Sequence, residues 1–338
     1  MTNPAERPEL AILRLVNGYQ LTQALSVAAT LGLADRLADG ARTSDELARE
    51  VGVHAETLYR LLRALASIDV FHEEPGRQFR LTELGAVLRT DAPESVRGWA
   101  AFVGDPSHWQ AWGDLLHSVR SGENAFRHVH GMDPWTLRAQ RPEDSAVFDR
   151  AMTSLSRQVA EQVIAAFDFG RFSSVVDVGG GNGAFLAAIL ARNPRLRGVL
   201  FDQPHVVAGA GPLLAAAGVA NRCEVVGGSF FDAVPRGEAA YVLKAILHDW
   251  EDADCLRILR VCRAAMTPGT ALLIVERELG PANARWEDKF SDLNMLVAPG
   301  GRERATAEYA ALVEAAGFRF VGVTPSASGR AVFESVAV

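Results

Sequence analysis

The sequence predicts an α/β protein: a mostly parallel sheet with helices on both faces, preceded by a mostly helical N-terminal domain. From residue 173 onward, buried apolar runs of strand length alternate with helical segments, a pattern typical of parallel sheets. The last two runs, "FRFVGVTP" and "AVFESVAV", flank a "SASGR" turn. They are too close for a crossover helix, so we expect a C-terminal hairpin that places one antiparallel strand in the sheet.

The N-terminal domain, residues 1–95, predicts a dimerisation module. Residues 9–31 carry apolar side chains at helical spacing on more than one face, and such a helix is often buried against a second subunit. We therefore expect a homodimer. Residues 43–89 then read as a helix starting near Asp45 with Thr43 or Ser44 as its cap, a turn at Gly52, a second helix, and a hairpin turning at Pro75–Gly76. This order is that of a winged helix.

A winged helix raises the possibility of DNA binding. Residues 1–100 contain 11 arginines, no lysine and 14 acidic residues, and the whole chain of 338 residues has a net charge of −7. Nucleic-acid binding depends on neutralising phosphates with a basic surface. We therefore expect no nucleic-acid partner, and interpret the winged helix as a dimerisation module and part of a substrate wall.

Targeting and redox signals are weak. The chain has three cysteines, too few and too scattered for a disulfide framework or a zinc cluster. Its first residues, "MTNPAERPEL", lack the features of a signal peptide, and no apolar run reaches membrane-spanning length. These observations predict a cytoplasmic protein without a membrane partner.

Residues 96–165 are predicted to form connecting helices that line a substrate pocket. Aromatic and histidine side chains are concentrated in this segment. Two interpretations stay open: ordinary core packing, or a wall that receives an aromatic ligand, because ligand pockets are lined largely by such side chains. The side chains concerned are His108, Trp109, Trp112, His128, His130, Trp135 and Phe148.

The C-terminal domain, residues 166–338, contains the expected sheet. Its elements alternate in the order that two-faced parallel sheets require. The predicted strands are "SSVVDVGG", "RGVLFD", "CEVVGGSFF", "YVLKAIL", "TALLIVERE" and the two hairpin strands. The predicted helices are "GAFLAAILARNP", "PHVVAGAGPLLAAAG", "DADCLRILRVCRAAM" and "RATAEYAALVEAAG".

A glycine-rich loop after the first strand predicts a nucleotide-like cofactor. In "VVDVGGGNGAF" four of the five positions 179–183 are glycine, which permits a tight turn and a close approach of backbone N–H groups to a ligand. Gly179, Gly181 and Ala184 also satisfy the dinucleotide fingerprint, so the loop alone does not distinguish NAD from S-adenosylmethionine. Asp202 ends the second strand, where a carboxylate can accept the ribose hydroxyls. Asp177, inside the first strand, is costly to bury without a partner and is expected to face either the ammonium group of the cofactor or the N–H groups of the loop.

A histidine at a strand tip predicts general-base chemistry. The fourth strand ends in "LKAILHDWED", and the tips of adjacent parallel strands meet at one edge of the sheet. An imidazole with an ordinary pKa near 6.5 is mostly neutral at pH 7 and accepts a proton. His248 is therefore the candidate base, with Glu276 and Glu303 to orient it. Asp249 has two interpretations, as a helix cap or loop acceptor and as a substrate contact.

Together these motifs resemble the plant-type small-molecule O-methyltransferases, and more closely their bacterial relatives that modify aromatic natural products. The resemblance covers nearly the whole chain and includes the C-terminal hairpin of the class I methyltransferase sheet. It implies a Rossmann-like domain, S-adenosylmethionine as cofactor and S-adenosylhomocysteine as product. The motifs that carry it are "VDVGGGNG", "FDQPHVV", "GGSFFDAVP", "LKAILHDWEDADC" and "PGGRERATAEY".

The resemblance also implies residue roles. The catalytic residues are His248, Glu276 and Glu303. The cofactor-binding residues are Ser156, Asp177, Gly179, Gly181, Asp202, Ser229, Phe230 and Lys244. The substrate-binding residues are Trp109, Phe148, Met152, Asp249, Asn294 and Met295. Ser229 departs from the family pattern, in which many relatives carry an aspartate before the aromatic residue.

The implied reaction is an in-line transfer of the sulfonium methyl group to a phenolic or other hydroxyl of an aromatic, polyketide-like acceptor. A sulfonium is already an activated leaving group, so no metal is expected. Three alternatives remain: a relative that keeps the cofactor but catalyses hydroxylation, decarboxylation or a pericyclic step, a winged-helix regulator that senses a small ligand, and a nicotinamide oxidoreductase.

Overall fold

The computed structural model describes residues 7–338 and separates them into two compact units. One contains the chain up to Trp109 together with Glu143–Ser154, and the other contains Gln110–Pro142 and Leu155–Val338. The connecting stretch 96–165 is shared between these units. The three-part division predicted at residues 95 and 165 therefore stays a prediction.

The first unit has the winged-helix order that the sequence predicts. Thr43 and Glu46 form a capping box at the start of α4 (Ser44–Val51), in which the side chain of each accepts a hydrogen bond from the backbone N–H of the other. Gly52 ends this helix in the left-handed conformation. The hairpin pairs Phe71–Leu81 through Glu74–Gln78. Its elements are α1 (Pro8–Val16), α2 (Gly18–Leu31), α3 (Leu33–Arg36), β1 (Arg42–Thr43), α4 (Ser44–Val51), α5 (Ala55–Ala66), β2 (Phe71–Glu74), β3 (Gln78–Leu81), α6 (Glu83–Ala86), α7 (Arg97–Val103) and the first part of α8 (Pro106–Gly113).

The predicted helix over residues 9–31 is two helices. The first ends at Asn17, whose N–H bonds back to the carbonyl of Leu13, and the second begins at Gly18. Asparagine and glycine are both weak helix formers, so the break falls where propensity is lowest. Many apolar side chains of α1 and α2 are exposed, with Ile12 at 60% and Val16 at 63%. Exposed apolar surface of this kind is typical of a protein–protein interface.

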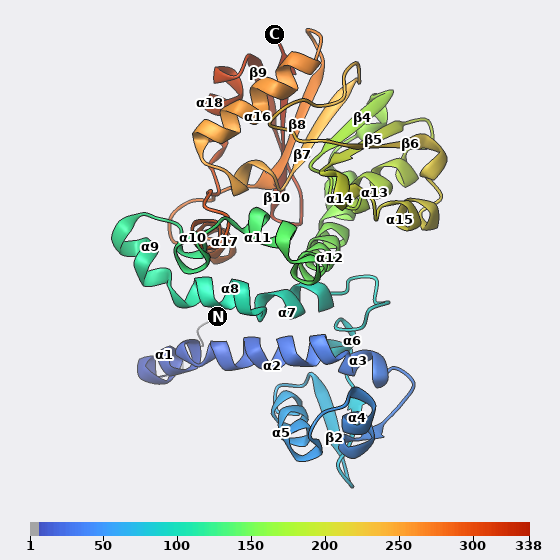
Figure 1. Cartoon of the computed structure of the whole chain (residues 1–338), viewed down its shortest axis with the longest axis vertical. Coiled ribbons are helices and arrows are strands. Elements are labelled where there is room, and N and C mark those ends of the chain that lie inside the picture. Colours follow the sequence, from blue (N-terminus) through green and yellow to red (C-terminus); the bar gives the residue numbers. More distant parts are fainter. Residues whose placement is uncertain (1–6) are drawn as a thin grey trace. The chain divides into compact units, whose positions relative to one another are not determined.

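The second unit is built on a seven-stranded sheet, which Figure 1 shows in side view. The strand order is β6-β5-β4-β7-β8-β10-β9. One strand, β10, runs antiparallel to the other six, as the hairpin argument predicts. The strands are β4 (Ser174–Val178), β5 (Arg197–Asp202), β6 (Cys223–Gly227), β7 (Ala240–Lys244), β8 (Ala271–Arg277), β9 (Phe318–Pro325) and β10 (Arg330–Ala337).

Helices cover both faces of this sheet (Figure 1). One face packs against α16 (Asp252–Ala265) and α18 (Thr306–Ala315), and the other against α13 (Ala184–Arg192) and the C-terminal half of α12 (Pro142–Ala166). Successive strand residues alternate between these two cores, since Val176 belongs to the first and Val175 to the second. The carboxyl ends of β4, β5, β7 and β8 are thereby fixed at one edge.

Two expectations for this unit need correction. The single helix predicted from Pro204 is two short ones, α14 (Pro204–Val207) and α15 (Gly211–Ala216), because Gly209, Gly211 and Pro212 interrupt the helical ladder. Strand β7 ends at Lys244 and is shorter than predicted, since Ala245 has a positive φ of 55°. The chain then turns into the short 3₁₀ helix η3 (Leu247–Asp249).

Four further helices complete the unit: α9 (Leu115–Ser121), α10 (Ala125–His130), α11 (Pro134–Gln140) and α17 (Trp286–Val297). Within residues 7–338, no helix combines the length and the apolar character needed to span a membrane.

Candidate active site at the carboxyl edge of the sheet

The glycine loop leaves β4 and enters α13. Gly179, Gly181 and Gly183 all have positive φ angles, of 72°, 61° and 85°. A side chain at Gly179 would collide with Ile246, whereas one at Gly181 would meet no described atom within 4 Å. The first glycine is thus required for packing, and the space beside the second is open to a ligand.

Two carboxylates border this loop. Asp202 ends β5 and accepts hydrogen bonds from the Gly181 N–H, at 2.8 Å, and from the Gln203 N–H, at 2.6 Å. Asp177 is 1% exposed, and neither of its oxygens has a hydrogen-bond partner among residues 7–338. Burial raises the pKa of Asp177 to about 7, although Lys244 opposes this shift. An orphaned buried carboxylate beside an open glycine loop fits a cationic, hydrogen-bonding ligand.

Lys244 stands at the end of β7, between the loop and the rest of the site. Its Nζ donates to Ser156 Oγ at 3.0 Å and lies 5.8 Å from the ring centre of Phe185. Burial and Arg330 lower the pKa of Lys244 to about 8, while Asp177 partly restores it. This lysine, one of only two in the chain, is therefore a partly buried cation whose charge interacts with the acidic groups at the strand tips.

His248 lies on η3, directly after β7, and is buried. Its Nδ1 is 3.1 Å from Glu303 Oε1 and 3.5 Å from Glu276 Oε2. Its Nε2 is 3.6 Å from Asp249 Oδ1, which is too long for a strong hydrogen bond. Carboxylates therefore fix the position of Nδ1, whereas Nε2 has no strong hydrogen bond to residues 7–338.

Glu276 and Glu303 make different hydrogen bonds around His248. Glu276 is fully buried at the end of β8, and its Oε1 accepts the N–H groups of Ile246 and Leu247 at 2.8 and 3.0 Å. It thus fixes the backbone that carries His248. Glu303 contacts the imidazole and also accepts a hydrogen bond from Ser291 Oγ at 2.7 Å.

The carboxylates change the protonation of His248. Burial opposes its charge, but Glu276, Glu303 and Asp249 outweigh burial and raise the pKa to about 9. The pKa of Glu303 falls to about 2, because the His248 charge and hydrogen bond overcome burial. The expectation of a mostly neutral His248 at pH 7 is therefore wrong for the ligand-free site, since two buried glutamates and the partly buried Asp249 stabilise the imidazolium.

Arg304 binds the backbone segment that carries His248, and it was not singled out from the sequence. It is fully buried and donates to the carbonyls of Leu247 and Trp250, both at 2.9 Å, and to Asp252 Oδ1 at 2.7 Å. Its place in "GGRERATAEY" was visible, but only burial distinguishes it from Arg302, whose side chain is 48% exposed. Arg304 therefore clamps the backbone on both sides of His248, through the carbonyls of Leu247 and Trp250.

The aromatic residue of the "GGSFF" segment lies near the glycine loop. The ring of Phe230 is 5.1 Å from that of Phe231 and 6.1 Å from that of Trp250. A side-chain carbon at Gly179 would come within 3.4 Å of Phe230 Cε1. The hydroxyl of Ser229 accepts the N–H of Phe231 at 3.2 Å and so closes its own turn.

Of the predicted substrate residues, Asn294 and Met295 lie on α17 in the same unit as His248. Asn294 Oδ1 accepts a hydrogen bond from Trp112 Nε1 at 3.0 Å, and Met295 is buried. Trp109, Phe148 and Met152 belong to the first unit. There the ring of Phe148 packs against Phe102, with centres 5.5 Å apart.

Comparison with known proteins now adds to this geometry. The profile of the O-methyltransferase domain matches residues 112–319, and that of the O-methyltransferase dimerisation domain matches residues 13–91. The chain belongs to the O-methyltransferase family. This confirms the resemblance inferred from the motifs, and the enzyme is an S-adenosylmethionine-dependent O-methyltransferase.

Relatives of this O-methyltransferase act in natural-product pathways. It is 44% identical to the phenazine O-methyltransferase of Lysobacter antibioticus, covering 96% of this chain and 95% of the relative. It is 40% identical to the mitomycin biosynthesis 6-O-methyltransferase of Streptomyces lavendulae, over 97% and 95% of the two chains. The aclacinomycin 10-hydroxylase of Streptomyces purpurascens is more distant, at 34% identity over 98% and 90%.

Solved structures confirm the predicted methyltransferase fold. The solved structure of LaPhzM superposes with a TM-score of 0.95 at 42% identity, covering 98% of this chain and 100% of the other. An O-methyltransferase of neocarzinostatin biosynthesis, solved with S-adenosylmethionine and 2-hydroxy-5-methyl naphthoic acid, gives a TM-score of 0.79 at 34% identity over 94% and 96%.

Proposed function

We propose that this enzyme transfers a methyl group from S-adenosylmethionine to a phenolic hydroxyl of an aromatic natural product, with His248 as the general base. The observation that carries the proposal is the buried imidazole at a strand tip. Its Nδ1 is held by Glu303 at 3.1 Å, while its Nε2 is left for another group. Such a geometry presents one nitrogen to an acceptor hydroxyl.

The residues around the glycine loop fit the cofactor. Bound S-adenosylmethionine supplies an electrophilic methyl group on a sulfonium, so its leaving group needs no metal ion. The open space at Gly181 and the orphaned carboxylate of Asp177 suit the amino-acid end of such a ligand. We assign Asp202 to the ribose and Phe230 to the adenine, with Ser229 as a further hydrogen-bonding group. Lys244 and Ser156 complete the site as a hydrogen-bonded pair.

The base takes the proton from the acceptor hydroxyl as its oxygen attacks the methyl carbon. With a pKa of about 9 in the ligand-free site, His248 starts either as a neutral imidazole beside a phenol or as an imidazolium beside a phenolate. The phenol with a neutral imidazole and the phenolate with an imidazolium contain the same number of protons. The histidine therefore stabilises the oxyanion in either order, while Glu303 and Glu276 stabilise the cation that results.

We assign acceptor contacts in each unit separately, without placing one unit against the other. They are aromatic, apolar or amide side chains plus one carboxylate, which suits a planar acceptor carrying polar substituents. The relatives named for phenazine and mitomycin pathways act on acceptors of that broad class. The proposed acceptor residues are Trp109, Phe148, Met152, Asp249, Asn294 and Met295. We also propose a homodimer, supported by the dimerisation-domain match and the exposed faces of α1 and α2.

The test replaces His248 by alanine. We expect the turnover of a phenolic acceptor to fall by about 10²–10⁴-fold, while binding of S-adenosylhomocysteine, measured by calorimetry, stays within about twofold of wild type. His72→Ala, at an exposed position of β2, is the matched control. Wild-type rates in His248→Ala, on an acceptor whose phenol is mostly protonated at the assay pH, would defeat the base assignment.

A second candidate function keeps the cofactor but not methyl transfer. The 34% identical hydroxylase relative favours it, because a whole-length relative with this fold carries another activity. Product mass spectrometry with methyl-labelled S-adenosylmethionine and a panel of phenols, anthracyclines and quinones separates the two. Label in the product supports methylation, and an unlabelled product 16 mass units heavier supports hydroxylation.

A further inference from the structure

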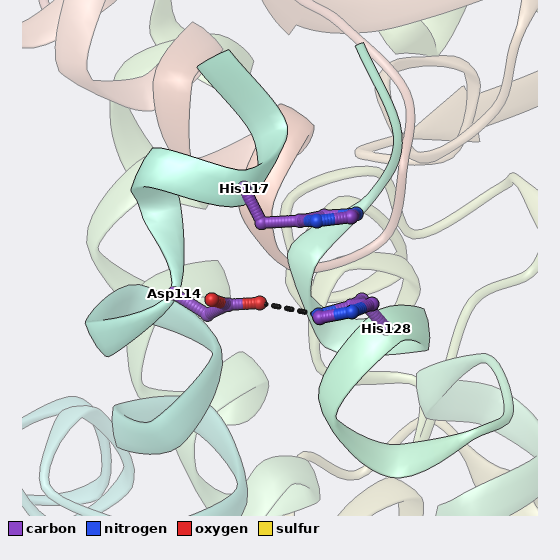
Figure 2. Close-up of side chains that lie close together, drawn as sticks. All are labelled: Asp114, His117 and His128. Carbon is purple, nitrogen blue, oxygen red and sulfur yellow. Dashed lines mark hydrogen bonds and ion pairs between the residues drawn. The ribbon is translucent and has the colours of Figure 1, made fainter. Parts of the chain in front are cut away.

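A second cluster of ionisable side chains lies in the segment that carries α9 and α10. Asp114 immediately precedes α9, His117 is on α9 and His128 is on α10. Figure 2 shows the two imidazole rings lying one above the other, with the Asp114 carboxylate pointing toward His128. Each of the three residues offers a ligand atom, and these atoms lie within 4.8 Å of one another.

From this arrangement we propose that Asp114, His117 and His128 form a surface site for a divalent first-row transition metal ion such as Zn²⁺. Two imidazoles and one carboxylate are a ligand set that Zn²⁺ and its neighbours prefer. The proposed site is separate from the methyl-transfer step, for which we expect no metal, and it contains no cysteine.

The contacts of the cluster support the proposal. His128 Nδ1 is 2.7 Å from Asp114 Oδ2, and His117 Nε2 is 3.2 Å from Glu123 Oε2. A bound ion would therefore find carboxylates beside both imidazoles, as first or outer ligands. The cluster is also accessible, because the side chains of His128 and Asp114 are 53% and 32% exposed.

Metal binding requires one local rearrangement. The rings are stacked with centres 3.7 Å apart and an angle of 7° between their planes. A nitrogen lone pair lies in the plane of its ring, so two parallel stacked rings cannot both point at one ion. His128, the more exposed of the two, must turn about its side-chain bonds, which separates the stack.

The site would act on the acceptor wall through Asn124, at the junction of α9 and α10. Its side-chain amide donates to the carbonyls of Leu296 and Val297 at the end of α17, at 2.7 and 3.1 Å. An ion that joins α9 to α10 therefore stiffens the support of α17, the helix that carries Asn294. This consequence rests on the proposed function, whereas metal binding itself does not.

The primary experiment titrates the metal-free, full-length enzyme with Co²⁺ and Zn²⁺. It follows the visible absorption of Co²⁺ and measures Zn²⁺ affinity by competition with a chromogenic chelator. We expect one equivalent per chain, and an affinity that falls more than about tenfold in His117→Ala and in His128→Ala. Binding should weaken as pH falls, because imidazole binds a metal only when neutral. His72→Ala is the control and should match wild type.

The catalytic cluster of His248, Glu276 and Glu303 offers competing ligands, so His248→Ala is titrated in parallel. Binding that survives the double variant His117→Ala/His128→Ala but disappears in His248→Ala would place the ion at the catalytic cluster and overturn the proposal. Absence of stoichiometric binding to wild type would overturn it as well. Neither result bears on methyl transfer, which is measured separately on the labelled product.

The link to the acceptor wall has its own readout. With saturating Zn²⁺, we expect the KM for the acceptor to change at least twofold in wild type and to stay constant in the double variant, with cofactor affinity unchanged in both. A KM that responds to Zn²⁺ equally in both proteins would contradict the coupling through α9 and α10.

Discussion

Replacing Glu303 by glutamine removes a negative charge 3.1 Å from His248 Nδ1 and keeps an oxygen that can accept the same hydrogen bond. His248 has a pKa of about 9, against an ordinary value near 6.5. The difference of about 2.5 units corresponds to about 3 kcal/mol favouring the charged imidazole. Three carboxylates produce this net shift against burial, and Glu303 contributes to it through both its charge and its hydrogen bond.

We therefore expect Glu303→Gln to lower the pKa of His248 by about 1 unit or more, which is on the order of 1 kcal/mol. The pKa is measured from the carbon chemical shifts of labelled histidine between pH 5 and 10. His248 is assigned by comparison with His248→Ala. Glu314→Gln, at an exposed position of the same helix α18, is the control.

The same shift predicts a sign for stability. A histidine whose pKa is higher in the folded state stabilises the fold fully below about pH 6.5 and loses that contribution as pH rises through 9. The wild-type free energy of unfolding should therefore fall more between pH 6.5 and 9.5 than that of Glu303→Gln, by on the order of 1 kcal/mol. Unfolding by urea at both pH values measures this. A His248 pKa that is the same in both proteins would refute the electrostatic account.

Three further predictions address the rest of the molecule. S-adenosylmethionine carries one more positive charge than S-adenosylhomocysteine. The pKa of His248 should therefore be lower in the S-adenosylmethionine complex than in the S-adenosylhomocysteine complex, and equal values would place the sulfonium elsewhere. Arg304→Lys keeps the charge but not the forked contacts to the loop. We expect kcat to fall about tenfold or more with a smaller change in acceptor KM, and circular dichroism to be unchanged; a wild-type kcat would contradict the clamp. Ile12→Glu should dissociate the proposed homodimer in sedimentation experiments, since it places a charge on the exposed apolar face of α1, whereas Val119→Glu, at an equally exposed position on α9, should not.

Much of the fold could be read from local patterns. The hairpin of β9 and β10 was predictable because a five-residue turn leaves no room for a crossover. The cap at Thr43 and the turn at Gly52 were predictable because each depends on residues next to it in the chain. The break at Asn17 and the division of α14 from α15 were missed, because a hydrophobic pattern continues across a weak point in a helix.

The candidate site divides along the same line. The sequence by itself determined which residue types stand near the strand tips, because the alternation of strands and helices gives the order of the elements and the edge at which parallel strands end; it thereby proposed Asp202, His248, Glu276 and Glu303 as site residues. Only the tertiary structure decided that Glu303, 55 positions from His248, lies 3.1 Å from its Nδ1, that Arg304 is fully buried, and that the surrounding carboxylates raise the pKa of the imidazole. The physical reason is that burial and charge–charge distance, which set a pKa, depend on contacts between distant segments.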